Sequence, residues 1–249
     1  MSGGWKDYFI PGTTVLKNLL GATDAEELRL LEEKLVFLRI SELQHEPLEG
    51  NFDYQHFKAI HRHLFQDVYE WAGQERTAPT DQFMVKAGYA YYPAGPELTK
   101  AANKIFAGLA RDNLLCDMTL EEFVPKLAEV WGELNVVHSF REGNTRTQTV
   151  FFAFLVDNAG FALDVERLAV DSELRERFIA ARFHSQDTGD NAQLARVLRE
   201  IVGGVHCWQR LRRGSLHELG IFAEGIDSEV ARSGIALAGD ERALHVLHE

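Results

Sequence analysis

The 249-residue sequence has few cysteines: Cys116 and Cys207 are its only two, and they form no CxxC pair. We therefore expect neither a disulfide scaffold nor a structural zinc site built on thiolates. Long apolar runs are also missing, because the longest, 150–156, is far short of the roughly 20 residues that a membrane-spanning helix needs. The N-terminus lacks the apolar core of a secretory signal. These absences predict a cytoplasmic globular protein with no membrane partner.

Positive charge is scarce as well. The sequence has 26 Lys and Arg against 38 Asp and Glu, a formal net charge of −12. This balance predicts no nucleic-acid partner and no attraction to anionic membranes. Any phosphate site must therefore be built locally, from a few well-placed groups.

Helical periodicity dominates the sequence. Apolar residues recur at steps of three and four after the capping box Thr23–Glu26, and they do so again in several later segments. These patterns predict helices from about Asp24, around 57–68, after Pro96, over 119–137 and 146–158, and over 171–184 and 191–211. By contrast, 76–93 alternates and is rich in β-favouring aromatics, which predicts a hairpin or extended flap. The expected fold class is all-α with a small β-hairpin flap.

The pattern also predicts a domain organisation. We expect residues 1–20 to form an N-terminal extension and residues 21–205 to form the main domain. Residues 206–249 are rich in small and charged side chains and are expected to form a helical or partly mobile tail.

Polar residues are concentrated in one loop between two apolar helices, VHSFREGNTRTQ at Val137–Gln148. Gly143-Asn144 permits a positive φ just before a helix begins, and free N–H groups at such a point form a natural anion site. Arg146 in the first helical turn adds a bidentate phosphate ligand. Together these features predict a phosphate-binding loop.

Three further residues of this loop carry chemistry or anchor it. Glu142 beside a phosphate site suits Mg²⁺, and His138 can serve as a general base near neutral pH. Phe140 is the one apolar residue in the loop and is expected to anchor it to the core. From composition alone, a plain turn with surface salt bridges remains the alternative.

The loop resembles the signature of the Fic/Doc family, HxFx(D/E)GNGRxxR. The matching positions are His138, Phe140, Glu142, Gly143, Asn144 and Arg146. The resemblance continues through 67–77, which is similar to the segment before the family's flap, and through 84–93, which is similar to the flap itself.

This resemblance implies a helical fold with a β-hairpin flap and transfer of AMP from Mg²⁺–ATP to a Ser, Thr or Tyr hydroxyl of a target protein. It also implies a role for each matching residue. His138 would be the general base, Glu142 the Mg²⁺ ligand, Gly143, Asn144 and Thr145 the phosphate cradle, Arg146 the ligand of the β-phosphate, and Met84, Val85 and Lys86 the flap that aligns the target by strand addition.

Two positions depart from the family pattern. Thr145 replaces the second loop glycine, so that either the nest differs or the residue adopts helical dihedrals. Thr149 replaces the final arginine, which in the family holds the γ-phosphate and pairs with an inhibitory glutamate. A changed donor and a non-catalytic nucleotide- or partner-binding module therefore remain alternatives. The family's inhibitory motif is not found in this sequence, which leaves a separate antitoxin chain as a possible partner.

Other polar residues are interpreted without catalytic roles. His56, His61 and His63 are expected to be surface or cap histidines, because no acid or cysteine completes a metal-ligand set with them. The glutamates at 26–27 and 32–33 are expected to form a solvated helix face. The tyrosines at 89–92 are expected to pack within the flap.

Overall fold

The computed structural model describes residues 4–86 and 88–204. Within them the chain forms seven α-helices, which confirms the predicted helical class. These helices are α1 (Ala25–His45), α2 (Tyr54–Phe65), α3 (Pro96–Arg111), α4 (Leu120–Val137), α5 (Asn144–Asn158), α6 (Glu173–Thr188) and α7 (Ala192–Ile201). Short 3-10 turns lie at η1 (Trp5–Tyr8), η2 (Asn113–Leu115) and η3 (Val165–Leu168). None of the described helices is long and apolar enough to cross a membrane.

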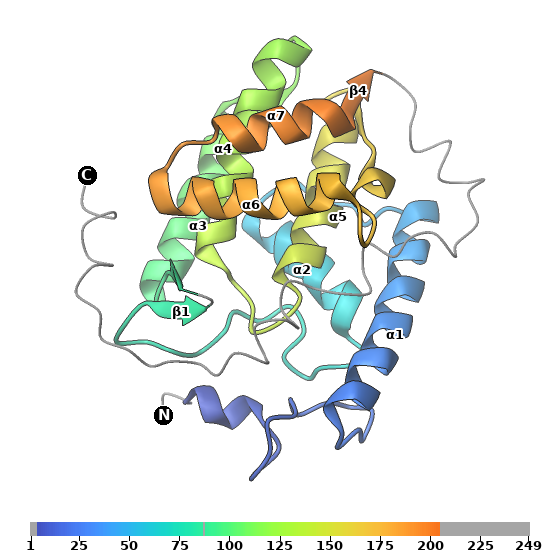
Figure 1. Ribbon diagram of the computed structural model, residues 1–249, viewed down its shortest axis with the longest axis vertical. Helices are drawn as coiled ribbons and strands as arrows, with labels where there is room; N and C mark the ends of the chain where they lie inside the picture. Colours follow the sequence, from blue (N-terminus) through green and yellow to red (C-terminus); the bar gives the residue numbers. More distant parts are fainter. Residues whose placement is uncertain (1–3, 87, 205–249) are drawn as a thin grey trace.

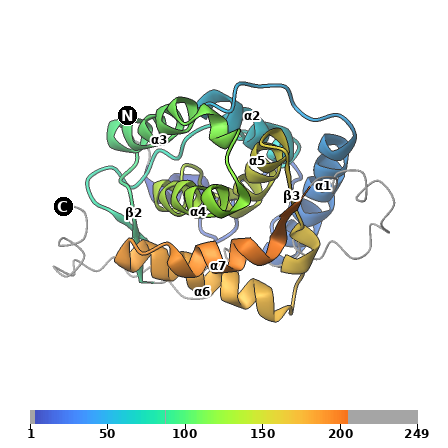
Figure 2. The ribbon, with the colours of Figure 1, turned by 90° about the horizontal axis from the view of Figure 1, so that it is seen from above.

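Helix α4 lies at the centre of the bundle (Figure 2). It begins at a capping box, in which the Thr119 hydroxyl accepts from the Glu122 N–H while the Glu122 carboxylate accepts from the Thr119 N–H. Its broad apolar stripe, with Phe123 and Trp131 fully buried, packs against α3, α5, α6 and α7. Helices α6 and α7 lie side by side across one face of α4 (Figures 1 and 2). The central helix therefore holds its C-terminal end, where the polar loop starts, in a fixed place.

The predicted flap is present as an antiparallel hairpin of β1 (Met84–Lys86) and β2 (Tyr89–Tyr91). In register, Met84 lies opposite Tyr91, Val85 opposite Ala90 and Lys86 opposite Tyr89. Helix α6 supports this hairpin, because the Tyr89 ring stacks on Phe183 with centroids 4.0 Å apart. In addition, the Gln186 side chain donates to the Ala90 carbonyl at 2.6 Å.

The sequence did not predict a second small sheet, formed by β3 (Phe161–Leu163) and β4 (Val202–Gly204). The predicted helix over 191–211 is wrong at 202–204, because α7 ends at Ile201 and the next three residues are extended; its last part, 205–211, lies outside the described residues. A β-branched residue followed by two glycines forms helix poorly, and the backbone of β3 offers these residues ladder partners. The two strands join the end of α7 to the segment after α5.

Residues 4–20 pack on the rest of the chain over the region that precedes the flap. The Thr77 N–H donates to the Tyr8 hydroxyl at 2.8 Å, and the Leu19 N–H donates to the Val68 carbonyl at 2.8 Å. The Tyr8 ring also meets Trp71 edge-on, with centroids 5.9 Å apart. The tail predicted for 206–249 lies outside the described residues.

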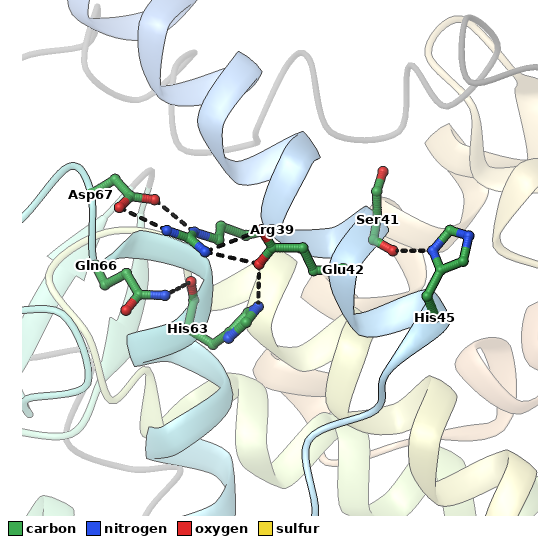
Figure 3. Close-up of polar contacts among 7 residues, drawn as sticks. All are labelled: Arg39, Ser41, Glu42, His45, His63, Gln66 and Asp67. Atoms are coloured by element: carbon green, nitrogen blue, oxygen red, sulfur yellow. Dashed lines mark hydrogen bonds and ion pairs between the residues drawn. The ribbon is translucent and has the colours of Figure 1, made fainter.

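A surface ion-pair cluster joins α1 to the end of α2 (Figure 3). The Arg39 guanidinium donates to both carboxylate oxygens of Asp67, at 2.7 and 2.9 Å, and also to Glu42 at 2.8 Å. His63 approaches the same Glu42 oxygen at 3.2 Å. The side chains of Arg39, Glu42 and Asp67 in this cluster remain partly exposed to solvent.

Candidate active site

His138 is the residue at which α4 ends. It adopts a left-handed conformation, with φ 47° and ψ 60°, while its N–H still reaches the Leu134 carbonyl at 3.4 Å. This conformation turns the chain out of the helix and leaves the His138 side chain buried beneath the flap. There the imidazole lies against the Tyr91 ring of β2, with centroids 4.4 Å apart. The candidate base and the flap are therefore in direct contact.

The loop after His138 is closed by Asn144. The Phe140 N–H donates to the Asn144 side-chain oxygen at 2.9 Å, and the Asn144 amide donates back to the Phe140 carbonyl at 2.8 Å. Phe140 is fully buried, as expected of an anchor, and it stacks on His61 and Phe57. Both polar ends of the Asn144 side chain thus hold the loop together, so its contribution to a phosphate has to come from its backbone N–H.

Gly143 is the residue that lets the loop enter α5. Its φ of +79° is left-handed, and a Cβ built there would lie 2.2 Å from Cζ of Phe65. Thr145, which replaces the second glycine of the family signature, lies within α5 and therefore adopts helical dihedrals. The Thr149 hydroxyl donates to the Thr145 carbonyl at 3.0 Å, one turn back in the same helix. The start of α5 therefore presents backbone N–H groups that a glycine N-cap has no side chain to satisfy.

Arg146 lies in a buried cluster with two carboxylates. Its Nη2 is 2.5 Å from Oε1 of Glu32 on α1 and 3.5 Å from Oε1 of Glu142 in the loop. The second oxygen of Glu32 accepts a short hydrogen bond from the Tyr69 hydroxyl. The guanidinium also lies over the Phe65 ring, 4.8 Å from its centroid. One arginine thus joins α1, α2 and the loop.

The expectation of a solvated acidic face is wrong for Glu32, whose side chain is buried against α5. Burial by itself lowers the pKa of Arg146, but the carboxylates of Glu32 and Glu142 more than offset this effect and raise it. Burial, with the negative charge of Glu32, raises the pKa of Tyr69. Because a buried arginine without its carboxylate partner is strongly unfavourable, Glu32 belongs to the site even though it follows no motif.

The expectation of surface or cap histidines is wrong for His56 and His61, both of which are buried. His61 is sandwiched beside Phe140, and its Nδ1 accepts from the Gly73 N–H at 2.8 Å. Its other nitrogen must therefore carry the proton and donate to the Glu142 carbonyl at 3.0 Å. Desolvation lowers the pKa of His61 to about 3. A neutral imidazole thus fixes the backbone of the predicted metal ligand.

The burial of His61 predicts a pH-dependent stability. The unfolded chain takes up a proton near the ordinary pKa of about 6.5, whereas the folded chain does not until about pH 3. Stability therefore falls as the pH drops below that ordinary value, by about 1.4 kcal/mol per pH unit for this one group. We expect His61→Gln, which keeps a donor and an acceptor, to show a slope smaller by that amount. Urea unfolding at pH 6 and pH 5 measures the difference, and equal slopes would contradict the prediction.

The structure brings most of the predicted site residues together. One turn and the start of α5 contain seven of them: His138, Phe140, Glu142, Gly143, Asn144, Thr145 and Arg146. Of the three predicted flap residues in β1, Met84 is buried and the other two, Val85 and Lys86, are half-buried. The flap reaches His138 through Tyr91 of β2, a contact that sequence reasoning did not assign.

One carboxylate of the loop suits a metal ion bound through a nucleotide. Within residues 4–86 and 88–204, no group of three or more His, Cys, Asp or Glu side chains is arranged to hold a metal. Mg²⁺ is often held by one or two carboxylates together with substrate phosphates and water. Glu142 lies beside the start of α5, with its Oε1 accepting from the Gly143 N–H at 3.1 Å, and so fits that arrangement.

Comparison with known proteins agrees with the geometry. The Fic/DOC family model matches residues 51–156. The chain is 37% identical over 193 residues to a probable protein adenylyltransferase of Sinorhizobium fredii, across 77% of this chain and 93% of that protein. It is 32% identical over 169 residues to a probable protein adenylyltransferase Fic of Salmonella typhimurium, across 68% of this chain and 81% of that protein. The chain belongs to the Fic/DOC family, which confirms the resemblance seen in the loop.

Solved structures show the same fold. The BepC protein of Bartonella tribocorum, crystallised with AMPPNP, aligns with a TM-score of 0.73 and 27% identity over 81% of this chain and 98% of that one. A Fic domain from Bartonella quintana with bound ADP aligns with a TM-score of 0.73 and 26% identity over 82% of this chain and 98% of that one. Both relatives hold an adenine nucleotide.

Proposed function

We propose that this chain is a protein adenylyltransferase that transfers AMP from ATP to a Ser, Thr or Tyr hydroxyl of a target protein. One structural observation supports this function above the others. The imidazole of His138, the open start of α5 and the flap converge on one loop, so that a base, a phosphate site and a surface for a peptide are adjacent. The relatives named as adenylyltransferases support the same reaction.

In the proposed reaction, the target hydroxyl oxygen attacks the α-phosphorus of ATP. A P–O bond forms to the target, the bond to the bridging oxygen breaks, and pyrophosphate leaves. His138 accepts the hydroxyl proton, because a neutral imidazole has a ring nitrogen that can act as a general base. The left-handed conformation of His138 places this base where α4 ends and the loop begins.

The phosphates would be held at the start of α5. The N–H groups of Asn144 and Thr145 supply hydrogen bonds at the positive end of the helix dipole. Arg146 would place its positive charge beside the β-phosphate, and its ion pair with Glu32 would fix where the guanidinium lies. Glu142 would hold Mg²⁺, which when bound neutralises developing charge on the phosphate oxygens. Each of these groups would act on charge that develops as pyrophosphate leaves.

The flap would hold the target. The backbone of Met84–Lys86 lies at an edge of the hairpin, so an extended target segment could pair with it as an added strand. Partners of this chain are accordingly a protein with an accessible hydroxyl and, for its control, a separate antitoxin chain. The compartment we propose is the cytoplasm, where ATP is available.

Thr149 supports an alternative in which the donor is not ATP or no group is transferred. Its hydroxyl bonds to the backbone of α5, so the position that carries arginine in the family pattern contributes no charge here. A donor with fewer or different phosphate charges would need that arginine less. The alternative is a Fic-fold transferase with another donor, or a module that binds a nucleotide or a partner without turnover.

The decisive experiment follows the label from two positions of ATP. Purified protein and cell lysate are incubated with Mg²⁺ and ATP labelled on the α-phosphate and, in a parallel reaction, on the γ-phosphate. We expect protein bands labelled from the α-position alone, with a mass gain of one AMP. Label from the γ-position would indicate phosphoryl transfer instead. Calorimetric binding of AMPPNP without any labelled band would favour the binding module, and a panel of other nucleotide donors would then test the changed-donor reading.

A further inference from the structure

Arg76 is a fully buried arginine that the proposed reaction does not use. It lies between α2 and β1, on the segment that leads into the flap. The sequence signature assigns it no role, and its guanidinium makes its hydrogen bonds to backbone carbonyls. Burial lowers the pKa of Arg76 to about 10, so the group remains charged at neutral pH.

The hydrogen bonds of Arg76 join the catalytic loop to both ends of the flap. Its Nε donates to the His138 carbonyl at 2.8 Å, and its own N–H donates to the Ser139 carbonyl at 2.9 Å. Its two Nη atoms donate to the Ala78 carbonyl, before β1, at 3.3 Å, and to the Tyr92 carbonyl, directly after β2, through a short bond. One planar guanidinium therefore joins a carbonyl of its own segment, at 78, to carbonyls at 92 and 138.

We propose that Arg76 is a positioning residue that sets the left-handed turn at His138 and couples it to the flap. The inference depends on the proposed function, because the reaction requires the base to lie opposite the target hydroxyl. The His138 carbonyl lies at the C-cap of α4, where the regular hydrogen-bond ladder of the helix ends, and it accepts from Arg76. A rigid fork with donors at fixed angles can hold that carbonyl and both flap ends in one geometry, which the flexible ammonium of lysine cannot do.

The test compares Arg76→Met and Arg76→Lys with wild type in the adenylyl-transfer assay, per folded molecule. We expect Arg76→Met to lower kcat by about a hundred-fold, because a displaced base is costly. The KM for ATP should change little, because Arg76 does not touch the start of α5, whereas the KM for the target should rise with a loosened flap. The kinetic pKa in the pH–rate profile should stay in place, because Arg76 acts through geometry. Arg76→Lys should recover part of the rate.

Arg39→Met is the matched control. It removes a bidentate contact from the surface cluster of Figure 3 and leaves the loop and flap untouched. We expect its kcat to stay within about two-fold of wild type. A kcat for folded Arg76→Met within about three-fold of wild type, or an equal rise in the KM for ATP, would overturn the proposal. If Arg76→Met does not fold, Arg76→Lys is judged by the same two criteria.

A second measurement needs no activity, and so separates this inference from the proposed function. Hydrogen exchange in wild type, Arg76→Lys and Arg39→Met reports on the backbone around 90–92 and 138–140. We expect Arg76→Lys to accelerate exchange in both segments together and Arg39→Met to accelerate it in neither. Faster exchange in one segment alone would show that Arg76 does not couple them. If wild type transfers no AMP but Arg76→Lys still accelerates exchange in both segments, the proposed function is contradicted and the coupling by Arg76 is supported.

Discussion

Replacement of His138 by asparagine is expected to lower kcat for AMP transfer by about a hundred-fold to ten-thousand-fold, the usual range for loss of a general base. Asparagine is the appropriate substitute, because residue 138 has φ 47° and asparagine tolerates that left-handed conformation better than other side chains do. The imidazole makes no part of the phosphate cradle, so binding of AMPPNP should be retained. The assay is label transfer from the α-phosphate of ATP, with binding measured in parallel by calorimetry.

His45→Asn provides the matched control for this substitution. His45 is exposed in the last turn of α1, and its ring contacts the Ser41 carbonyl of the same helix at 2.7 Å (Figure 3). We expect its transfer rate to equal that of wild type within about two-fold. Wild-type transfer by His138→Asn would remove His138 from its role. A large drop in the unfolding midpoint of His138→Asn would show instead that the substitution damaged the loop.

The helical fold and the catalytic loop could be predicted because both are encoded locally. Apolar periodicity marks both α1 and α4. A capping box begins α4, whereas α1 begins at Asp24, whose side chain caps the helix in place of the predicted box from Thr23 to Glu26. The loop residues from His138 to Arg146 are contiguous in sequence. A motif with fixed spacing in a single turn needs no long-range information. The flap was predictable for the same reason, since β1 and β2 are joined by a short turn.

Glu32 and His61 could not be assigned from polarity, but their periodicity carried a signal. The buried residues of α1 include Leu28, Glu32 and Val36, at steps of four. Glu32 thus occupies a position on the buried face of α1 where the pattern expects an apolar residue, unlike its neighbour Glu33. His61 is likewise on the buried face of α2. A polar residue at an apolar position indicates a buried partner, and only packing against the loop reveals which one.

Arg76 carried no such signal. It lies in an irregular segment, and its partners are backbone carbonyls of 78, 92 and 138. Every residue has a carbonyl, so no residue type in the sequence marks such partners. The strand β4 was missed for a related reason, because its ladder depends on β3, which is distant in sequence. What the sequence does not show is therefore where backbone groups from distant segments meet.

Gly143→Ala is expected to destabilise the protein by about 2–5 kcal/mol. About 1–2 kcal/mol comes from placing a Cβ on a residue with φ +79°, and about 1–3 kcal/mol from overpacking, because that Cβ would lie 2.2 Å from Cζ of Phe65. Gly160→Ala separates the two causes, since Gly160 has φ +84° but no atom within 4 Å of its added Cβ. Urea unfolding of both variants measures the costs.

Phe65→Leu provides the second half of the argument, because leucine lacks the ring atoms that the new Cβ would meet. In this background we expect Gly143→Ala to cost at least about 1 kcal/mol less than in wild type, as coupling between contacting residues predicts. Gly160→Ala should cost the same in both backgrounds. An identical cost for Gly143→Ala and Gly160→Ala, unchanged by Phe65→Leu, would show that the left-handed backbone alone requires glycine at the start of α5. A coupled cost would show that α2 presses directly on the turn that forms the phosphate site, so that the packing of Phe65 fixes where the N–H groups of α5 point.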